Sequence, residues 1–64
     1  MSPYQGRVVD EKSELDKKLA ALDTFIESEI FQGLPMGEQD RLPIQRMFMK
    51  GYSDILARRI AAFR

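Results

Sequence analysis

The chain has 64 residues, with ten basic and ten acidic side chains and a formal net charge of zero. It contains no cysteine and no histidine, which excludes disulfides, thiolate metal sites and the commonest general base of enzymes. A chain this short buries only about 60% of the surface that its unfolded form exposes. Small domains without disulfides or metals are usually stabilised by self-association. The composition therefore predicts one small domain that assembles with copies of itself.

The first six residues contain Pro3 and Gly6, and this composition predicts an extended lead-in over residues 1–6. A long amphipathic helix is predicted over residues 7–31, because apolar side chains recur at helical spacing and no glycine or proline interrupts them before Gly33. The face that this helix buries is expected to consist of Leu15, Leu19, Leu22 and Ile26.

A connector is predicted over residues 32–42. Gly33 is typical of a helix end, and Pro35 prevents the first helix from resuming directly. A second helix is predicted over residues 43–63, with Pro43 in its first turn, where the missing N–H group is not needed.

The second predicted helix carries more apolar side chains than a hairpin can bury. A two-helix hairpin needs one apolar stripe on each helix, so the excess indicates contact with other protomers. The predicted fold is all-α: a two-helix antiparallel hairpin over residues 7–64 that assembles into a compact helical homo-oligomer. The apolar band comprises Ile44, Met47, Phe48, Tyr52, Ile55, Leu56, Ile60 and Phe63.

The charges are unevenly distributed along the chain. Residues 7–29 carry four basic and seven acidic side chains, whereas residues 41–64 carry six basic and one acidic. This asymmetry favours antiparallel pairing of the two helices, although exposed ion pairs contribute only about 0–1 kcal/mol each. The basic half could equally bind an anion. No apolar run approaches the roughly 18 residues of a membrane span, so we expect a soluble intracellular protein.

No arrangement of residues typical of an active site is visible. The carboxylates follow one another along an exposed helix face, and no nucleophile has a histidine or cysteine beside it. A glycine-rich phosphate loop, a zinc-ligand spacing and a calcium loop are all absent. We therefore expect a binding or assembly protein rather than an enzyme, with no cofactor.

Five side chains allow both a structural and a ligand-binding interpretation. Tyr4 could cap the end of the core, or its ring could stack on a nucleobase. Lys17 and Lys18, together with Arg58 and Arg59, could be solvated charges or could surround phosphates.

Two further positions have alternatives of the same kind. Gly51 lies within the second predicted helix, where glycine costs about 1 kcal/mol relative to alanine. It indicates either a close helix crossing or a close approach of the backbone to a ligand. Arg7 lies near Tyr4 in the sequence and could add a positive charge beside a bound phosphate.

The segments RVVDEKSELDKKLAALDTFI and MKGYSDILARRIAAF resemble the helical hairpin shared by phage anti-CBASS and anti-Thoeris cyclic-nucleotide sponges. The resemblance spans roughly residues 4–63. It implies a phage protein that sequesters immune second messengers in the host bacterial cytoplasm without cleaving them. It also implies compact oligomers, often hexamers, that bind cyclic dinucleotides such as 3′,3′-cyclic GMP-AMP, and in some members cyclic trinucleotides, between protomers.

The family's pocket uses a tyrosine near the start of the hairpin and a lysine further along the first helix. The resemblance assigns these roles to Tyr4 and to Lys17 or Lys18. The alternative function is a small oligomerisation module or a DNA-associated regulatory module. The apolar band of the second helix leaves little free face for a DNA groove, so we expect no binding to duplex nucleic acid.

Overall fold

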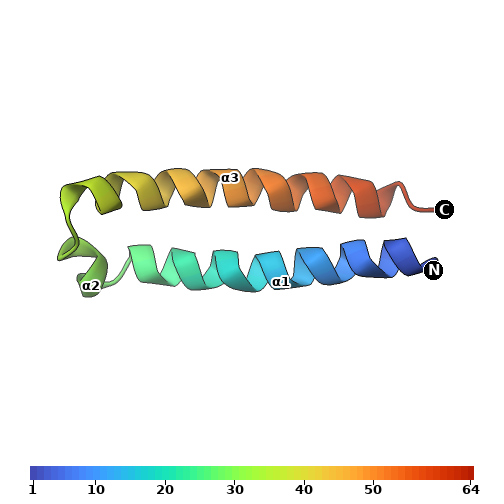
Figure 1. Ribbon diagram of the computed structural model, residues 1–64, viewed down its shortest axis with the longest axis horizontal. Coiled ribbons are helices and arrows are strands. Elements are labelled where there is room, and N and C mark those ends of the chain that lie inside the picture. Colours follow the sequence, from blue (N-terminus) through green and yellow to red (C-terminus); the bar gives the residue numbers. More distant parts are fainter.

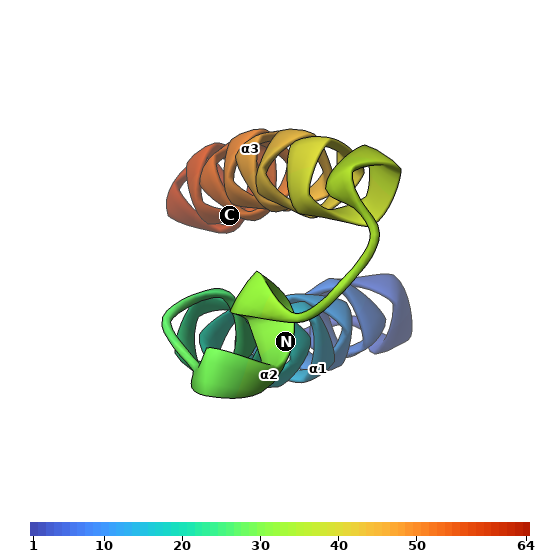
Figure 2. The same cartoon turned by 90° about the vertical axis from the view of Figure 1, so that its left-hand side faces the viewer.

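The computed structural model describes residues 1–64, and every regular element in it is a helix. The elements are α1 (Pro3–Ile26), the single turn α2 (Glu29–Gln32) and α3 (Met36–Ala61). Figure 1 shows α1 and α3 running antiparallel, with α2 at the bend and both termini at the other end. The end-on view in Figure 2 shows two stacked long helices and no third layer. The prediction of an all-α chain is confirmed, and the molecule is elongated, 47 × 14 × 13 Å.

The predicted extended lead-in over residues 1–6 is wrong, because α1 already begins at Pro3. Ser2 is the N-cap residue, and its N–H group donates a hydrogen bond of 2.9 Å to Oε1 of Gln5. Proline suits the first helical position because its φ angle is preset and its missing N–H group would have no partner there. Pro3 therefore starts the helix and does not mark a loop.

The first long helix also ends earlier than the predicted residue 31, at Ile26. Ser28 adopts an extended conformation and caps α2: its Oγ accepts a hydrogen bond from the N–H of Phe31 and donates one to the carbonyl of Phe25. A serine at an N-cap competes with continuation of the preceding helix. The chain consequently kinks before it turns.

The predicted connector over residues 32–42 is mostly helical, because α3 begins at Met36 and not at residue 43. Pro35 is its N-cap, with a non-helical backbone (φ −53°, ψ 146°). Pro43 lies inside α3 and is exposed, so water can hydrogen-bond the carbonyl that its missing N–H group leaves free. The second helix is therefore continuous through Pro43.

The two long helices pack along one seam in which buried and half-buried positions alternate at intervals of three and four residues. This spacing is the heptad pattern of a coiled coil. The predicted apolar face of α1 is confirmed as part of this inner seam. On α1 the inner seam comprises Gln5, Val8, Lys12, Leu15, Leu19, Leu22 and Ile26, and on the α3 side Leu42, Arg46, Met49, Ser53, Leu56, Ile60 and Phe63.

The inner seam is thin. Five of the 64 residues are buried, and Leu56 is the one large side chain that is almost completely enclosed, with 1% of its surface exposed. A two-helix layer can enclose side chains only between its helices. Most apolar side chains outside the seam therefore stay at the surface.

A polar cluster interrupts the seam near its middle. Nζ of Lys12 donates to Oδ2 of Asp16 at 2.7 Å and to Oγ of Ser53 at 2.9 Å, and the Ser53 hydroxyl donates to Oδ1 of Asp16 at 2.5 Å. The hydrogen bond from Lys12, followed by that from Ser53, lowers the pKa of Asp16 below its ordinary value of 3.8. Buried polar groups that need particular partners favour one register of helix pairing.

The register of the hairpin follows from two side-chain pairs that cross it. Asp16 on α1 bonds Ser53 on α3, and seven residues further along α1 Asp23 forms an ion pair with Arg46. The two pairs are spaced by the same seven residues on both helices, in opposite directions. One antiparallel register therefore applies over the length of the inner seam.

Candidate functional site

The predicted site residues fall into two groups along the hairpin. Tyr4 and Lys18 both lie on α1, fourteen residues apart, which corresponds to about 21 Å at 1.5 Å per residue. Arg7 is about 16 Å from Lys18 by the same measure. One chain therefore does not bring Tyr4 and Lys18 into one pocket, and the two groups have to be considered separately.

The first group lies at the end where the two termini meet. The ring of Tyr4 packs edge-on against the ring of Phe63, with centroids 5.9 Å apart, and about half of the tyrosine surface stays exposed. Tyr4 therefore does cover the end of the core, which was one of its two interpretations. Its exposed part leaves room for a second contact. Arg7 is exposed on α1 near this end.

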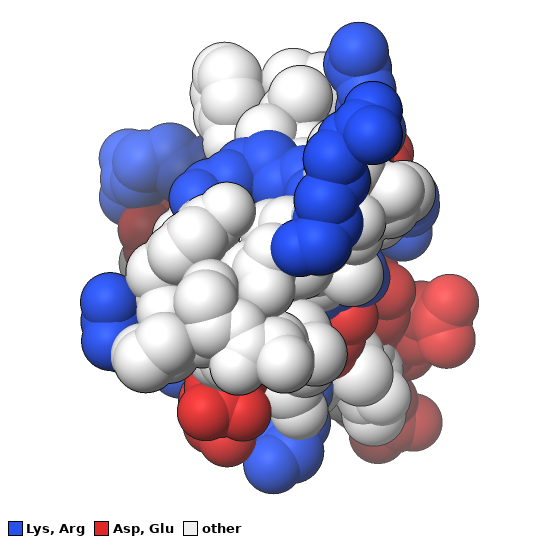
Figure 3. All heavy atoms as spheres, turned by 90° about the vertical axis from the view of Figure 1, so that its right-hand side faces the viewer, with Lys and Arg blue, Asp and Glu red and all other residues white.

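Arg58 and Arg59 lie near the same end on α3. With Ile55 and Ala62 they line a shallow, open recess. Neither guanidinium takes part in an ion pair within the chain. Figure 3 looks at this end of the molecule and shows much of the positive charge on the α3 side and acidic side chains toward α1. Two unpaired guanidinium groups beside an apolar side chain can bind an anion that carries an aromatic ring.

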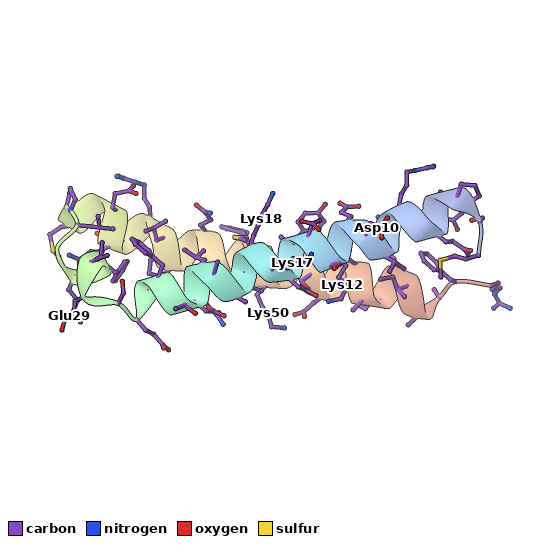
Figure 4. The ribbon with its side chains drawn as sticks, turned by 90° about the horizontal axis from the view of Figure 1, so that it is seen from below. Asp10, Lys12, Lys17, Lys18, Glu29 and Lys50 are labelled. Atoms are coloured by element: carbon purple, nitrogen blue, oxygen red, sulfur yellow. The ribbon has the colours of Figure 1, made fainter.

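The second group lies at the middle of the hairpin, where the two lysines differ. Nζ of Lys17 forms an exposed ion pair with Oε1 of Glu14 at 3.2 Å, whereas Lys18 has no ion-pair partner. Nζ of Lys50 forms an ion pair with Oδ1 of Asp54 at 2.6 Å. Figure 4 shows Lys18 and Lys50 projecting from opposite edges of the hairpin. Lys18 is therefore the free cation at this level of the molecule.

Gly51 lies at the level of Lys18, because the register that pairs Asp16 with Ser53 places residue 18 opposite residue 51. A Cβ atom built at Gly51 meets nothing within 4 Å. A close crossing of α1 and α3 at this glycine, one of its two interpretations, is therefore wrong within a single hairpin. The glycine faces outward and leaves the backbone of α3 accessible.

Tyr52 is a site residue that the sequence interpretation missed. It lies at the level of Lys17 and Lys18, and 45% of its surface is exposed. Tyr52 follows Lys50 by two helical positions, which corresponds to about 200° of rotation around α3. It therefore projects toward the edge opposite Lys50. Figure 4 shows that this is the edge from which Lys18 projects. We call Lys18, Gly51 and Tyr52 the central site. The heptad register of α3 was the signal that could have found it.

The central site and the terminal group offer cations, aromatic rings and accessible backbone. No cluster of three or more carboxylates that could hold a metal ion is present, and no helix is long and apolar enough to cross a membrane. This chemistry suits binding of a flat, anionic molecule, in which rings stack and cations approach phosphates.

Fold and surfaces together define a small antiparallel helical hairpin with exposed aromatic and cationic residues. The model of the Sequestin family matches residues 2–62, so the chain belongs to the Sequestin family. It is 41% identical over 64 residues to a protein of Enterobacteria phage T4, and the match covers all of both chains. That relative is described as an uncharacterised 7.5 kDa protein in the denB–rIIB intergenic region. No solved structure matches the chain.

Proposed function

We propose that this protein is a phage anti-defence protein that sequesters a cyclic oligonucleotide second messenger of its bacterial host and does not cleave it. Three observations support this: the name of the family, the phage origin of the T4 relative, and the resemblance of the hairpin to cyclic-nucleotide sponges. The proposed ligands are cyclic dinucleotides such as 3′,3′-cyclic GMP-AMP, and in second place cyclic trinucleotides. The proposed place of action is the host bacterial cytoplasm during infection.

The observation that carries the proposal is the central site. Lys18 has no ion-pair partner and lies on the same edge, and at the same level, as the half-exposed ring of Tyr52. A tyrosine ring stacks on any nucleobase, worth about 1–3 kcal/mol per base. A lysine ammonium neutralises a phosphate as a point charge. Gly51 lies beside them on the face of α3 that α1 leaves uncovered.

The terminal group is proposed as a second contributor. Tyr4, Arg7, Arg58 and Arg59 supply one ring and three guanidinium groups near one end of the hairpin. Since this end lies about 20 Å from Lys18 along α1, a pocket that uses both groups requires a neighbouring protomer. Pockets between protomers agree with the proposed self-association into a homo-oligomer, with a hexamer as the expected size.

Calorimetric titration of the purified protein with a panel of cyclic di- and trinucleotides tests the proposal. Lys18→Ala should weaken binding about 10- to 100-fold, because charge-assisted hydrogen bonds are worth about 1.5–3 kcal/mol. Lys17→Ala is the matched control, since its ammonium already pairs with Glu14. The bound ligand should be recovered intact after heat denaturation of the protein.

Three outcomes would contradict the proposal: no binding to any member of the panel, equal losses for the two lysine variants, or a linear nucleotide product. The alternative function, a DNA-associated module, has its own signature. Its affinity for duplex DNA should fall steeply as the salt concentration rises, because bound counterions are released from the phosphates.

A further inference from the structure

The outer face of α3 carries a second apolar stripe that α1 does not touch. Its large side chains are between 45% and 70% exposed, whereas Ser53 and Leu56 on the inner face of the same helix are buried. Soluble monomers rarely expose contiguous apolar patches of this kind without a binding partner. We call this surface the outer stripe, and it comprises Ile44, Met47, Phe48, Gly51, Tyr52 and Ile55.

Gly51 lies near the middle of the outer stripe and has no role inside the chain. Glycine in a helix interior costs about 1 kcal/mol relative to alanine, and no neighbouring atom within 4 Å requires its small size. Small residues let two helix backbones approach closely. The spacing of Ile44, Phe48, Gly51 and Ile55, at intervals of four, three and four residues, is that of a helix-pairing seam.

We propose that the outer stripe binds the outer stripe of a second copy of this chain, with the two α3 helices antiparallel and a two-fold axis at Gly51. A surface that pairs with itself around such an axis is the common arrangement of homodimers. The resulting unit is a four-helix bundle. In it each α3 contacts its own α1 and the α3 of the second copy, whereas each α1 contacts only its own α3.

Charge distribution along α3 favours the antiparallel orientation. Arg58 and Arg59 near the C-terminal end have no ion-pair partner, and neither has Asp40 near the N-terminal end. Antiparallel pairing brings the unpaired arginines of one chain toward the Asp40 end of the other. Parallel pairing would place the arginines of both chains together, and like charges at close range repel.

The size of the outer stripe is sufficient for such a contact. Its five large side chains, about half exposed, would bury roughly 100 Å² each. Two chains together would then remove about 1,000 Å² from water, which reaches the lower limit for specific interfaces. Contact with a second copy can therefore bury an area of this size, whereas a partner that buried a single side chain could not.

The two-fold axis has a consequence for the central site, and this part rests on the proposed function. Lys18 and Tyr52 lie at the level of the axis, and the two-fold rotation leaves both copies of them on the same edge of the bundle. Two tyrosines then lie beside the axis, and two lysines lie farther out on the same edge, one on each α1. A cyclic dinucleotide has two bases and two phosphates, so its own symmetry agrees with a site that has one tyrosine and one lysine from each chain.

The experiment compares Gly51→Leu with the matched control Gly6→Leu, since both glycines are helical and have open space around their Cβ positions. Light scattering at micromolar concentration, without ligand, should give the wild type at least twice the chain mass of 7.4 kDa. Gly51→Leu should lose at least half of the wild-type mass while circular dichroism shows its helices intact. Gly6→Leu should keep the wild-type mass.

Cross-linking tests the orientation, because the chain has no cysteine of its own. Gly51→Cys should form a disulfide-linked dimer on mild oxidation, whereas Ala62→Cys, near the end of α3, should not. Equal cross-linking of both variants would indicate parallel pairing and overturn the proposal. A monomeric wild type, or an unchanged mass for Gly51→Leu, would also overturn it. If Gly51→Leu dissociates but the wild type binds no cyclic nucleotide, the proposal that the outer stripe binds a second copy is supported and the proposed function is wrong.

Discussion

The outer faces of the two long helices differ in chemistry, although both helices contribute to the same inner seam. The outer face of α1 carries exposed charged side chains such as Glu11, Glu14 and Lys17. The outer face of α3 exposes large apolar side chains such as Met47 and Phe48. A charged face is stable in contact with water, whereas burial of an apolar face away from water lowers the free energy. This difference indicates that α1 needs one partner helix and α3 needs two.

The largest change in stability is expected from a substitution on the inner face of α3, compared with one at a neighbouring residue on its outer face. Leu56→Ala removes the most enclosed side chain of the inner seam and should cost about 2–5 kcal/mol. In a chain of this size that corresponds to a fall in melting temperature of about 10 °C or more. Thermal melts followed by circular dichroism should show this fall at every protein concentration.

Ile55→Ala is the paired variant, on the outer stripe. Its melting temperature should fall mainly at high protein concentration, where the wild type gains stability from association. If Ile55→Ala and Leu56→Ala lower the melting temperature equally in dilute solution, the distinction between the two faces of α3 is wrong.

Binding of the ligand distinguishes the two tyrosines. Tyr52→Ala should reduce the affinity for the preferred cyclic dinucleotide about 10- to 100-fold, because stacking is worth about 1–3 kcal/mol per base. Tyr4→Ala loses the edge-on contact with Phe63 and should lower the melting temperature as well. Calorimetric titrations beside thermal melts measure both effects. A larger affinity loss for Tyr4→Ala would move the site to the terminal end of the hairpin.

Much of the fold could be predicted from the sequence. The spacing of Leu15, Leu19, Leu22 and Ile26 correctly located the inner face of α1, and the hairpin followed from it. Helix ends were missed because single residues decided them against the general pattern. Pro3 starts a helix, and Ser28 caps a separate turn.

The central site could be predicted only in part. Lys18 was named, but Tyr52 was counted within one broad apolar band, because the sequence alone does not divide α3 into two faces. That division depends on which positions α1 covers. It became visible only from pairs that cross the hairpin, such as Ser53 with Asp16. Tyr4 and Lys18, by contrast, look close in the sequence but lie too far apart along a rigid helix.

The polar cluster of the inner seam allows a smaller test of stability. Ser53→Ala leaves Asp16 and Lys12 with one partner fewer in a partly enclosed position and should cost about 1–2 kcal/mol. Ser13→Ala, on the exposed face of α1, is the control and should have almost no effect. Urea titration of both variants measures the difference. Equal stability of the two variants would show that the polar cluster does not stabilise the pairing of α1 with α3.

The smallest expected effect is a pH dependence of stability. Hydrogen bonds from Lys12 and Ser53 lower the pKa of Asp16 below 3.8, so the unfolded chain binds more protons than the folded chain in this range. The contribution of Asp16 to stability is therefore complete above about pH 4 and is lost as the pH falls through the lowered pKa. Urea midpoints measured from pH 6 down to pH 2 should fall less steeply for Asp16→Asn. A slope equal to that of the wild type would contradict the role of Asp16.

The stoichiometry of ligand binding tests the two-fold central site most directly. Calorimetric titration of the wild-type protein with its preferred cyclic dinucleotide should saturate at one ligand for every two chains, because two copies of Lys18 and Tyr52 share one axis. The same value should hold whatever even number of chains the oligomer contains. Saturation at one ligand per chain would place a complete pocket on each hairpin and contradict a site built around the axis at Gly51.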